Sequence, residues 1–173
     1  MRKLACIPLL FVAACGDGEA EKNAAAPATA ASLAAGQWEL TSEVTAFRAA
    51  DGGAPRIDTP VGTRATQSVC VGAGQPPIEF FAGDGFTCTT GASYIRNGRM
   101  NVTASCTRDG LEGSIQIMAD GTFQADSAEF NRNIGTMLST DGDVEITARV
   151  DGRRTGDCTP GTESGGNNAA TAG

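Results

Sequence analysis

Six cysteines are the residues of this chain with the clearest chemistry, since a thiol can be acylated, oxidised to a disulfide or bound to a metal. Cys6 and Cys15 lie near the N-terminus, and four more follow at spacings of 18, 18 and 52 residues: Cys70, Cys88, Cys106 and Cys158. The chain has no histidine, which excludes His-based triads, Cys–His pairs and His-containing zinc motifs. If the chain is exported, the even number of cysteines after Cys15, which is four, favours two disulfides. Free buried thiols and a metal site are the alternatives, although zinc sites usually contain a short Cys-x-x-Cys pair.

The residues before Cys15 have the three-part layout of a secretory signal. Arg2 and Lys3 are positively charged, residues 4–14 form an apolar run, and its last residues, Val12-Ala13-Ala14, lead directly into the cysteine. This arrangement resembles the lipobox of bacterial lipoproteins, whose thiol is acylated before the signal is removed. It predicts a signal peptide over residues 1–14, which takes Cys6 with it, and a lipid anchor such as palmitate on Cys15.

A transmembrane helix and an ordinary cleaved signal are the other interpretations of residues 4–14. A helix of that length spans about 17 Å, against about 30 Å of hydrocarbon, and Pro8 interrupts it. In lipoproteins an aspartate directly after the cysteine retains the protein at the inner membrane, whereas here that residue is Gly16. We therefore expect an outer-membrane lipid anchor facing the periplasm of a Gram-negative bacterium.

Composition divides the mature chain into a tether, one domain and a tail. The net charge of −7 becomes −9 when Arg2 and Lys3 are lost with the signal, which argues against nucleic acid as a partner. Residues 15–35 contain the lipidated cysteine and an Ala-rich segment, which predicts a disordered tether. Residues 36–160 are long enough for one β-domain, and residues 161–173 predict a disordered tail.

Asp-Gly and Asn-Gly steps recur along the domain and favour the positive φ angles of tight hairpin turns. They begin at Asp51, Asp84, Asn97, Asp109, Asp120, Asp141 and Asp151. Apolar residues alternate at Trp38 and Leu40 and again over residues 144–150, which indicates strands with one buried face. We expect an all-β fold, a single antiparallel meander of about 7–8 strands in a curled sheet or small barrel.

The hairpin registers indicate which cysteines meet. A two-residue turn at positions 109–110 aligns the apolar residues of its flanking strands on one face, with Cys106 opposite Gly113. A three-residue loop at positions 96–98 then brings Cys88 opposite Cys106 on that face, at a separation that suits a disulfide. The expected bridges are Cys88–Cys106 and therefore Cys70–Cys158. A two-residue turn at positions 97–98 would instead place Cys88 and Cys106 on opposite faces.

Residues 75–83 break the alternation, with prolines at the opening and a glycine at the close, and predict one short helical insert. Its Ile78, Phe80 and Phe81 are unusually apolar for a loop. They either plug one end of the sheet, which we favour, or form a mobile lid over an apolar cavity.

No further motif predicts a catalytic, cofactor-binding or metal-binding residue. The chain has no Gly-x-Ser-x-Gly elbow, and residues 141–145 match only part of a calcium loop. The many carboxylates lie mostly beside glycine in expected turns, where solvent contact is the simplest role. Arg153 and Arg154 could clamp an anion, but we favour the interpretation that their charges protect a hairpin edge.

The domain resembles a known family at its start, at its four cysteines and at its end. The start is Gly36-Gln37-Trp38-Glu39, and the end is Gly152-Arg153-Arg154-Thr155-Gly156-Asp157-Cys158. These features resemble the proteobacterial family of domains of unknown function numbered 3617, over about residues 36–158. The chain departs from the family pattern in a longer, Gly- and Pro-rich stretch at residues 51–63. The resemblance implies a small exported β-domain, often lipid-anchored, and implies no activity.

These observations predict a lipid-anchored periplasmic envelope protein that is a binding or interaction module and not an enzyme. Its expected partners are the membrane, through Cys15, and an apolar ligand or an envelope protein, without a cofactor. A carboxylate-dependent envelope hydrolase is the alternative. The missing histidine and the precedent of small ligand-holding barrels favour the binding module.

Overall fold

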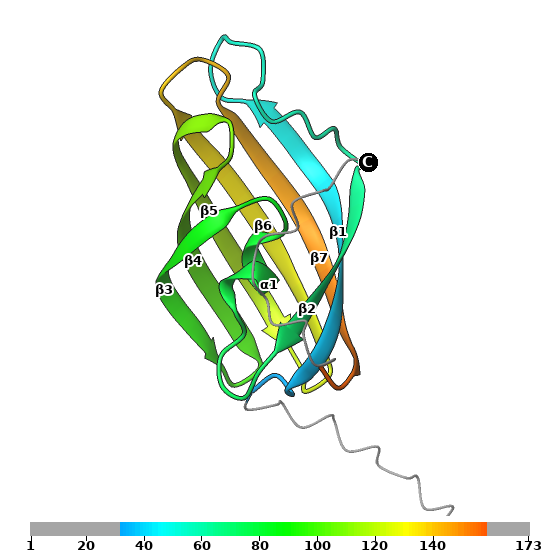
Figure 1. The fold of residues 1–173 in the computed structure, drawn as a ribbon. Helices are drawn as coiled ribbons and strands as arrows, with labels where there is room; N and C mark the ends of the chain where they lie inside the picture. The colour runs from blue at the N-terminus through cyan, green and yellow to red at the C-terminus, as the bar shows by residue number, and fades with distance from the viewer. Residues whose placement is uncertain (1–31, 159–173) are drawn as a thin grey trace, which may run out of the picture.

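The computed structural model describes residues 32–158, so the predicted signal, Cys15, most of the tether and the tail lie outside the described residues. Seven antiparallel strands form one curled sheet, a half-barrel, with one short helix on its concave side (Figure 1). The elements are β1 (Gly36–Ala49), β2 (Arg64–Val71), α1 (Ile78–Ala82), β3 (Thr87–Arg96), β4 (Arg99–Arg108), β5 (Leu111–Phe123), β6 (Ser127–Leu138) and β7 (Val144–Gly156). The all-β prediction with one helical insert is confirmed. Within residues 32–158, none of the helices has the length and apolarity to cross a bilayer.

The strand order is β2-β1-β7-β6-β5-β4-β3. The strands from β3 to β7 follow one another as predicted for a meander, and β1 and β2 form a separate hairpin. The pairing of β1 with β7 joins the two parts. The chain therefore passes from one edge of the sheet to the other between β2 and β3, and α1 lies on this crossing (Figure 1).

Two of the Asp-Gly steps lie inside long strands instead of turns, at Gly121 in β5 and Gly152 in β7. A Cβ at Gly121 would collide with the carbonyl oxygen of Glu129, and one at Gly152 would lie 2.7 Å from a methyl carbon of Leu40. These glycines allow close approach by a neighbouring strand or side chain. The sequence pattern overstates the number of turns for this reason.

The predicted three-residue loop between β3 and β4 is wrong. The turn has two residues, Asn97 and Gly98, with φ of 54° and 71°. A β-bulge between residues 90 and 93 compensates for the shorter turn, so Cys88 still pairs with Cys106.

The predicted register of β4 with β5 is also wrong, by two residues. Residues 108 and 111 flank the expected turn, but a shift beyond it places Cys106 opposite Ile115 instead of Gly113. Because two residues are a full side-chain repeat of a strand, the apolar side chains keep the same face.

Each edge strand is tied to the rest of the sheet by a cysteine pair. Cys88 in β3 lies 4.1 Å from Cys106 in β4, measured between Cα atoms, and Cys70 in β2 lies 5.5 Å from Cys158. Both pairs are at disulfide distance, and they are the pairs expected from the sequence.

The concave side holds two buried clusters. Trp38, Phe80 and Phe130 lie in one, and Ile115 and Ile117 lie in the other. Leu33, which lies within the predicted tether, is 4% exposed and packs in the first cluster. The packed domain therefore begins a few residues earlier than predicted.

Candidate ligand-binding site

The apolar residues of the α1 segment are packed into the concave side. Phe80 is 0% and Phe81 2% exposed, and Ile78 is partly buried. The Phe80 ring meets the edge of Trp38 at 5.6 Å and stacks on Phe130 at 5.9 Å between ring centroids. This packing is that of a plug, and movement of the segment as a lid stays a prediction.

A charged residue interrupts the apolar row that β6 presents to the same side. Alternation along β6 turns Ala128, Phe130, Arg132 and Thr136 inwards, and all four are buried. Arg132 is 7% exposed. Arginine is almost never buried to this extent unless it is paired. The concave side of the sheet therefore holds a cation within its apolar surface.

The Arg132 guanidinium is held against the end of α1. Its Nε donates a hydrogen bond to the carbonyl oxygen of Phe81 at 2.5 Å. Gly83 lies so near that a Cβ there would be 2.7 Å from Nη1, and its φ of 83° also favours glycine. Within residues 32–158, no carboxylate forms an ion pair with Arg132, and neither Nη atom has a hydrogen-bond partner.

Burial lowers the pKa of the Arg132 guanidinium to about 10, and the charge of Asp84 acts in the opposite direction. The side chain therefore stays a cation at neutral pH. Asp84 itself is exposed, on the turn that follows α1. The two opposite charges influence each other through space without direct contact.

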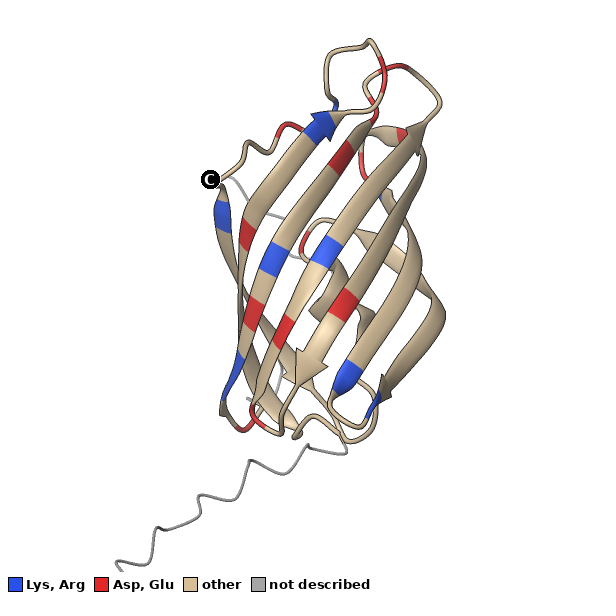
Figure 2. Ribbon diagram, turned by 180° about the vertical axis from the view of Figure 1, so that it is seen from behind, with Lys and Arg blue, Asp and Glu red and all other residues tan. Residues whose placement is uncertain are grey.

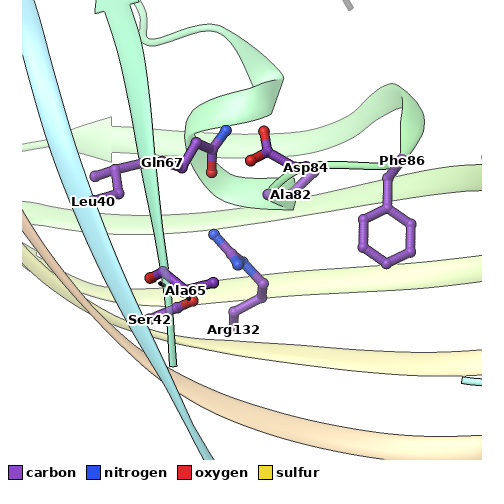
Figure 3. Close-up of a pocket in the computed structure, with 9 residues that line it drawn as sticks. Leu40, Ser42, Ala65, Gln67, Ala82, Asp84, Phe86 and Arg132 are labelled. Atoms are coloured by element: carbon purple, nitrogen blue, oxygen red, sulfur yellow. Dashed lines mark hydrogen bonds between the residues drawn. The ribbon is translucent and has the colours of Figure 1, made fainter. Parts of the chain in front are cut away.

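A pocket of about 160 Å³ opens beside this guanidinium (Figure 3). Its lining comes from β1 and β2 on one side, from the last residue of α1 and the turn after it on the other, and from β6: Leu40, Ser42, Ala65, Gln67, Ala82, Gly83, Asp84, Phe86 and Arg132. An apolar cavity of about 150 Å³ is known to hold benzene, so a ligand of that size fits. The predicted lid residues Ile78, Phe80 and Phe81 do not line this pocket.

Besides Arg132, the lining contains polar groups from two other segments, Gln67 on β2 and Asp84 on the turn after α1. Gln67 donates its amide N–H to the carbonyl oxygen of Glu79 at 3.1 Å, which ties β2 to α1 and leaves the amide oxygen available. In Figure 3 the Arg132 side chain points towards the segment that carries Ala82 and Asp84. The pocket therefore combines donors on Arg132, acceptors on Asp84 and Gln67, and a remainder that is apolar except for Ser42.

The other candidates from the sequence do not join this pocket. Arg154 donates from Nε to the carbonyl oxygen of Ala35 at 2.7 Å and pairs with Asp157, so it holds the start of β1. Asp143 accepts hydrogen bonds from Thr136 and Leu138, and residues 32–158 contain no metal-ligand cluster. Cys15 lies outside the described residues.

Arg132 belongs to none of the motifs that the sequence singles out. A signal was available: Ala128, Phe130 and Ile134 recur with the two-residue period of a strand, and Arg132 occupies the missing position in that row. A cation among the inward-facing apolar side chains of a strand predicts a polar partner or a pocket beside it. No spacing rule, however, indicates that α1 lies against it.

A second hollow of about 230 Å³ lies on the opposite, convex side of the sheet. Its lining includes Glu129, Asn131 and Arg149, and Arg149 pairs with Glu129 at 3.3 Å and with Asp151 at 3.4 Å. The lining also includes Asp120, so exposed carboxylates outnumber the one arginine, and this arginine is already shared between two carboxylates. The hollow therefore offers an anionic ligand no free cation.

The family resemblance is confirmed by comparison with known families. A family model described as a protein of unknown function, DUF3617, matches residues 33–158, which include the four paired cysteines and the whole pocket. No curated protein and no solved structure gives a significant match. Because the match spans most of the chain, the protein belongs to the DUF3617 family.

Proposed function

We propose that the chain is a lipid-anchored periplasmic protein of the outer membrane, and that its β-domain is a binding module, not an enzyme. The signal-like N-terminus and Cys15 support the anchor. The pocket at Arg132 supports the binding of a small ligand and is the site where we place it.

The observation that carries the proposal is a buried guanidinium that faces a pocket without an ion pair in the described domain. Removing a charge from water costs several kcal/mol unless a partner compensates. The hydrogen bond from Arg132 Nε to the carbonyl oxygen of Phe81 uses only one of the guanidinium donors. A neutral side chain could donate the same bond, so this bond alone does not explain a buried charge. The Nη atoms add nothing to this bond, but they suit an anionic group, which arginine binds with two parallel hydrogen bonds.

Native mass spectrometry of the full-length protein purified from its own membranes tests the binding function. We expect a small non-covalent adduct on the wild type that is lost in Arg132→Gln. Arg149→Gln is the matched control, because it removes an arginine from the opposite face of the neighbouring strand. An adduct that persists in Arg132→Gln, or no adduct on any of the three proteins, would contradict the proposal.

Metabolic labelling with palmitate tests the anchor separately. Cys15→Ala should abolish the label and leave the precursor unprocessed or released in soluble form. Cys6→Ala is the control, since this cysteine lies inside the predicted signal and its loss should leave labelling unchanged. Label that persists in Cys15→Ala would refute the anchor.

A further inference from the structure

The pocket carries information about the charge of its ligand. Arg132 supplies a positive charge and Asp84 a negative one, and the two are not among the ion pairs of the described residues. A ligand with only an anionic group would satisfy Arg132 but would lie beside the Asp84 carboxylate. A doubly charged anion would be repelled most, and the net charge of the chain, −7, adds to that repulsion.

The same pocket also contains hydrogen-bond acceptors, in addition to the donors of Arg132. Asp84 has two carboxylate oxygens, and Gln67 has an amide oxygen that remains available because its N–H binds Glu79. A positively charged donor group on the ligand would therefore meet acceptors within the same pocket that offers its carboxylate a guanidinium.

The remaining lining sets the size and polarity of the rest of the ligand. Leu40, Ala65, Ala82 and Phe86 provide apolar contact. The volume of about 160 Å³ suits a short branched or ring-shaped group and excludes a long acyl chain from full enclosure.

Resting on the proposed binding function, we infer that the ligand is a small zwitterion of the amino-acid type. Its carboxylate binds the Nη atoms of Arg132, its ammonium group faces Asp84 and Gln67, and its short apolar side chain contacts Leu40 and Phe86. The inference differs from the expectation of a purely apolar ligand because the lining holds both charges.

Three related probes separate the contributions: valine, 3-methylbutanoate, which lacks the ammonium group, and isobutylamine, which lacks the carboxylate. Isothermal titration of the full-length protein in detergent should show binding of valine, about tenfold weaker binding of 3-methylbutanoate, and no measurable binding of isobutylamine. Asp84→Asn should reduce valine affinity to that of 3-methylbutanoate. Arg132→Gln should remove binding of both, and Arg149→Gln should change none of the affinities.

The outcomes distinguish this inference from the proposed function. If 3-methylbutanoate binds as tightly as valine, or Asp84→Asn leaves valine affinity unchanged, the zwitterion inference is wrong while a ligand site at Arg132 stands. If no probe binds, the inference is also wrong, and the membrane-derived adduct decides the proposed function independently. Asp84→Asn keeps the test decisive even where Arg132→Gln does not fold, because Asp84 is exposed.

Discussion

Two arginines on neighbouring strands, Arg132 in β6 and Arg149 in β7, meet opposite environments. Arg132 faces the concave side, is 7% exposed and has no ion pair within the described domain. The Arg149 side chain faces the convex side, is 57% exposed and contacts two carboxylates. Figure 2 shows positive and negative residues interspersed over the strands of the sheet seen from behind.

The difference shows which charges need an explanation. Exposed pairs such as Arg149–Glu129 contribute about 0–1 kcal/mol to stability, because both side chains stay in contact with water. A buried cation lowers stability unless something compensates it. Burial lowers the pKa of Arg132 to about 10, which is the direction expected when the charged form is disfavoured. The concave face thus carries a stability cost that the convex face avoids.

The largest expected difference between the two faces concerns packing. Phe81→Ala should lower the free energy of unfolding by about 3–5 kcal/mol, because it leaves a cavity among buried aromatic rings. Met118→Ala on the convex face, where Met118 is 51% exposed, should change it by less than about 0.5 kcal/mol. Denaturant melts measure both. Unchanged stability of Phe81→Ala together with lost ligand binding would favour the lid over the plug.

The second prediction concerns β3, an edge strand with little burial on either side. Replacing both Cys88 and Cys106 by serine should cost about 3 kcal/mol, because the bond closes a segment of 18 residues in the unfolded chain. Peptide mapping should show Cys70–Cys158 intact in this variant. A loss below about 1 kcal/mol would mean that side-chain packing alone holds the edge strand.

The third prediction compares the two arginines directly. Arg132→Met should raise the free energy of unfolding by about 1–2 kcal/mol, since a similar-sized apolar side chain removes the desolvation cost at the expense of one hydrogen bond. Arg149→Met should lower it by at most about 1 kcal/mol. Thermal melts at pH 7 and without ligand provide the measurement. Marked destabilisation by Arg132→Met would assign Arg132 a structural role at the end of α1.

The two arginines also differ in how they make stability depend on pH. Since burial lowers the folded pKa of Arg132 to about 10, below the ordinary arginine value, the folded state loses its proton at a lower pH than the unfolded chain. The contribution of this group to stability is therefore constant near neutral pH and rises as pH increases above about 10, towards the ordinary arginine pKa. Arg132→Met should lack that rise, whereas Arg149→Met should retain it. Equal curves for the two variants would contradict the assignment.

The smallest expected effect on stability concerns Asp51, which lies in the loop after β1 and on neither face of the sheet. The Asp51 carboxylate accepts backbone N–H bonds from Gly53, Gly142 and Asp143 at 2.8, 2.9 and 3.0 Å, which lower its pKa below 3.8. A lowered carboxyl pKa stabilises the fold above the unfolded value and loses that effect as pH falls through the folded value. Asp51→Asn should therefore melt earlier than wild type at pH 7 and match it in strong acid. A difference that persists in acid would point to lost geometry instead of lost charge.

Strand alternation and turn residues predict the fold class, the cysteine pairing and the buried aromatic residues of α1. They do not predict the bulge near residue 91, because a bulge adds a residue without changing the hydrophobic pattern that surrounds it. Gly121 and Gly152 follow aspartate as turn glycines do, yet they serve close packing inside strands. Local pattern alone does not separate these two uses of glycine.

The pocket depends on contacts between distant segments, which explains why the sequence predicts it poorly. Arg132 meets Phe81 across a separation of 51 residues, and the lining combines β1, β2 and β6 with the turn after α1. The alternation of β6 places the arginine on the inner side, but only the crossing from β2 to β3 brings α1 against it.

The pairing of β1 with β7 also fixes the order in which the domain can fold. Residue 37 pairs with residue 156, so the longest connection in the sheet closes only when the last strand has been synthesised. Such non-local pairings slow folding, because the chain entropy is lost before the contacts form. Until β7 arrives, β1 has β2 as its only partner strand, and Cys70 cannot reach Cys158. The sheet can therefore close, and its second disulfide can form, only once β7 is present, whereas β3 to β6 and the Cys88–Cys106 pair involve only neighbouring segments.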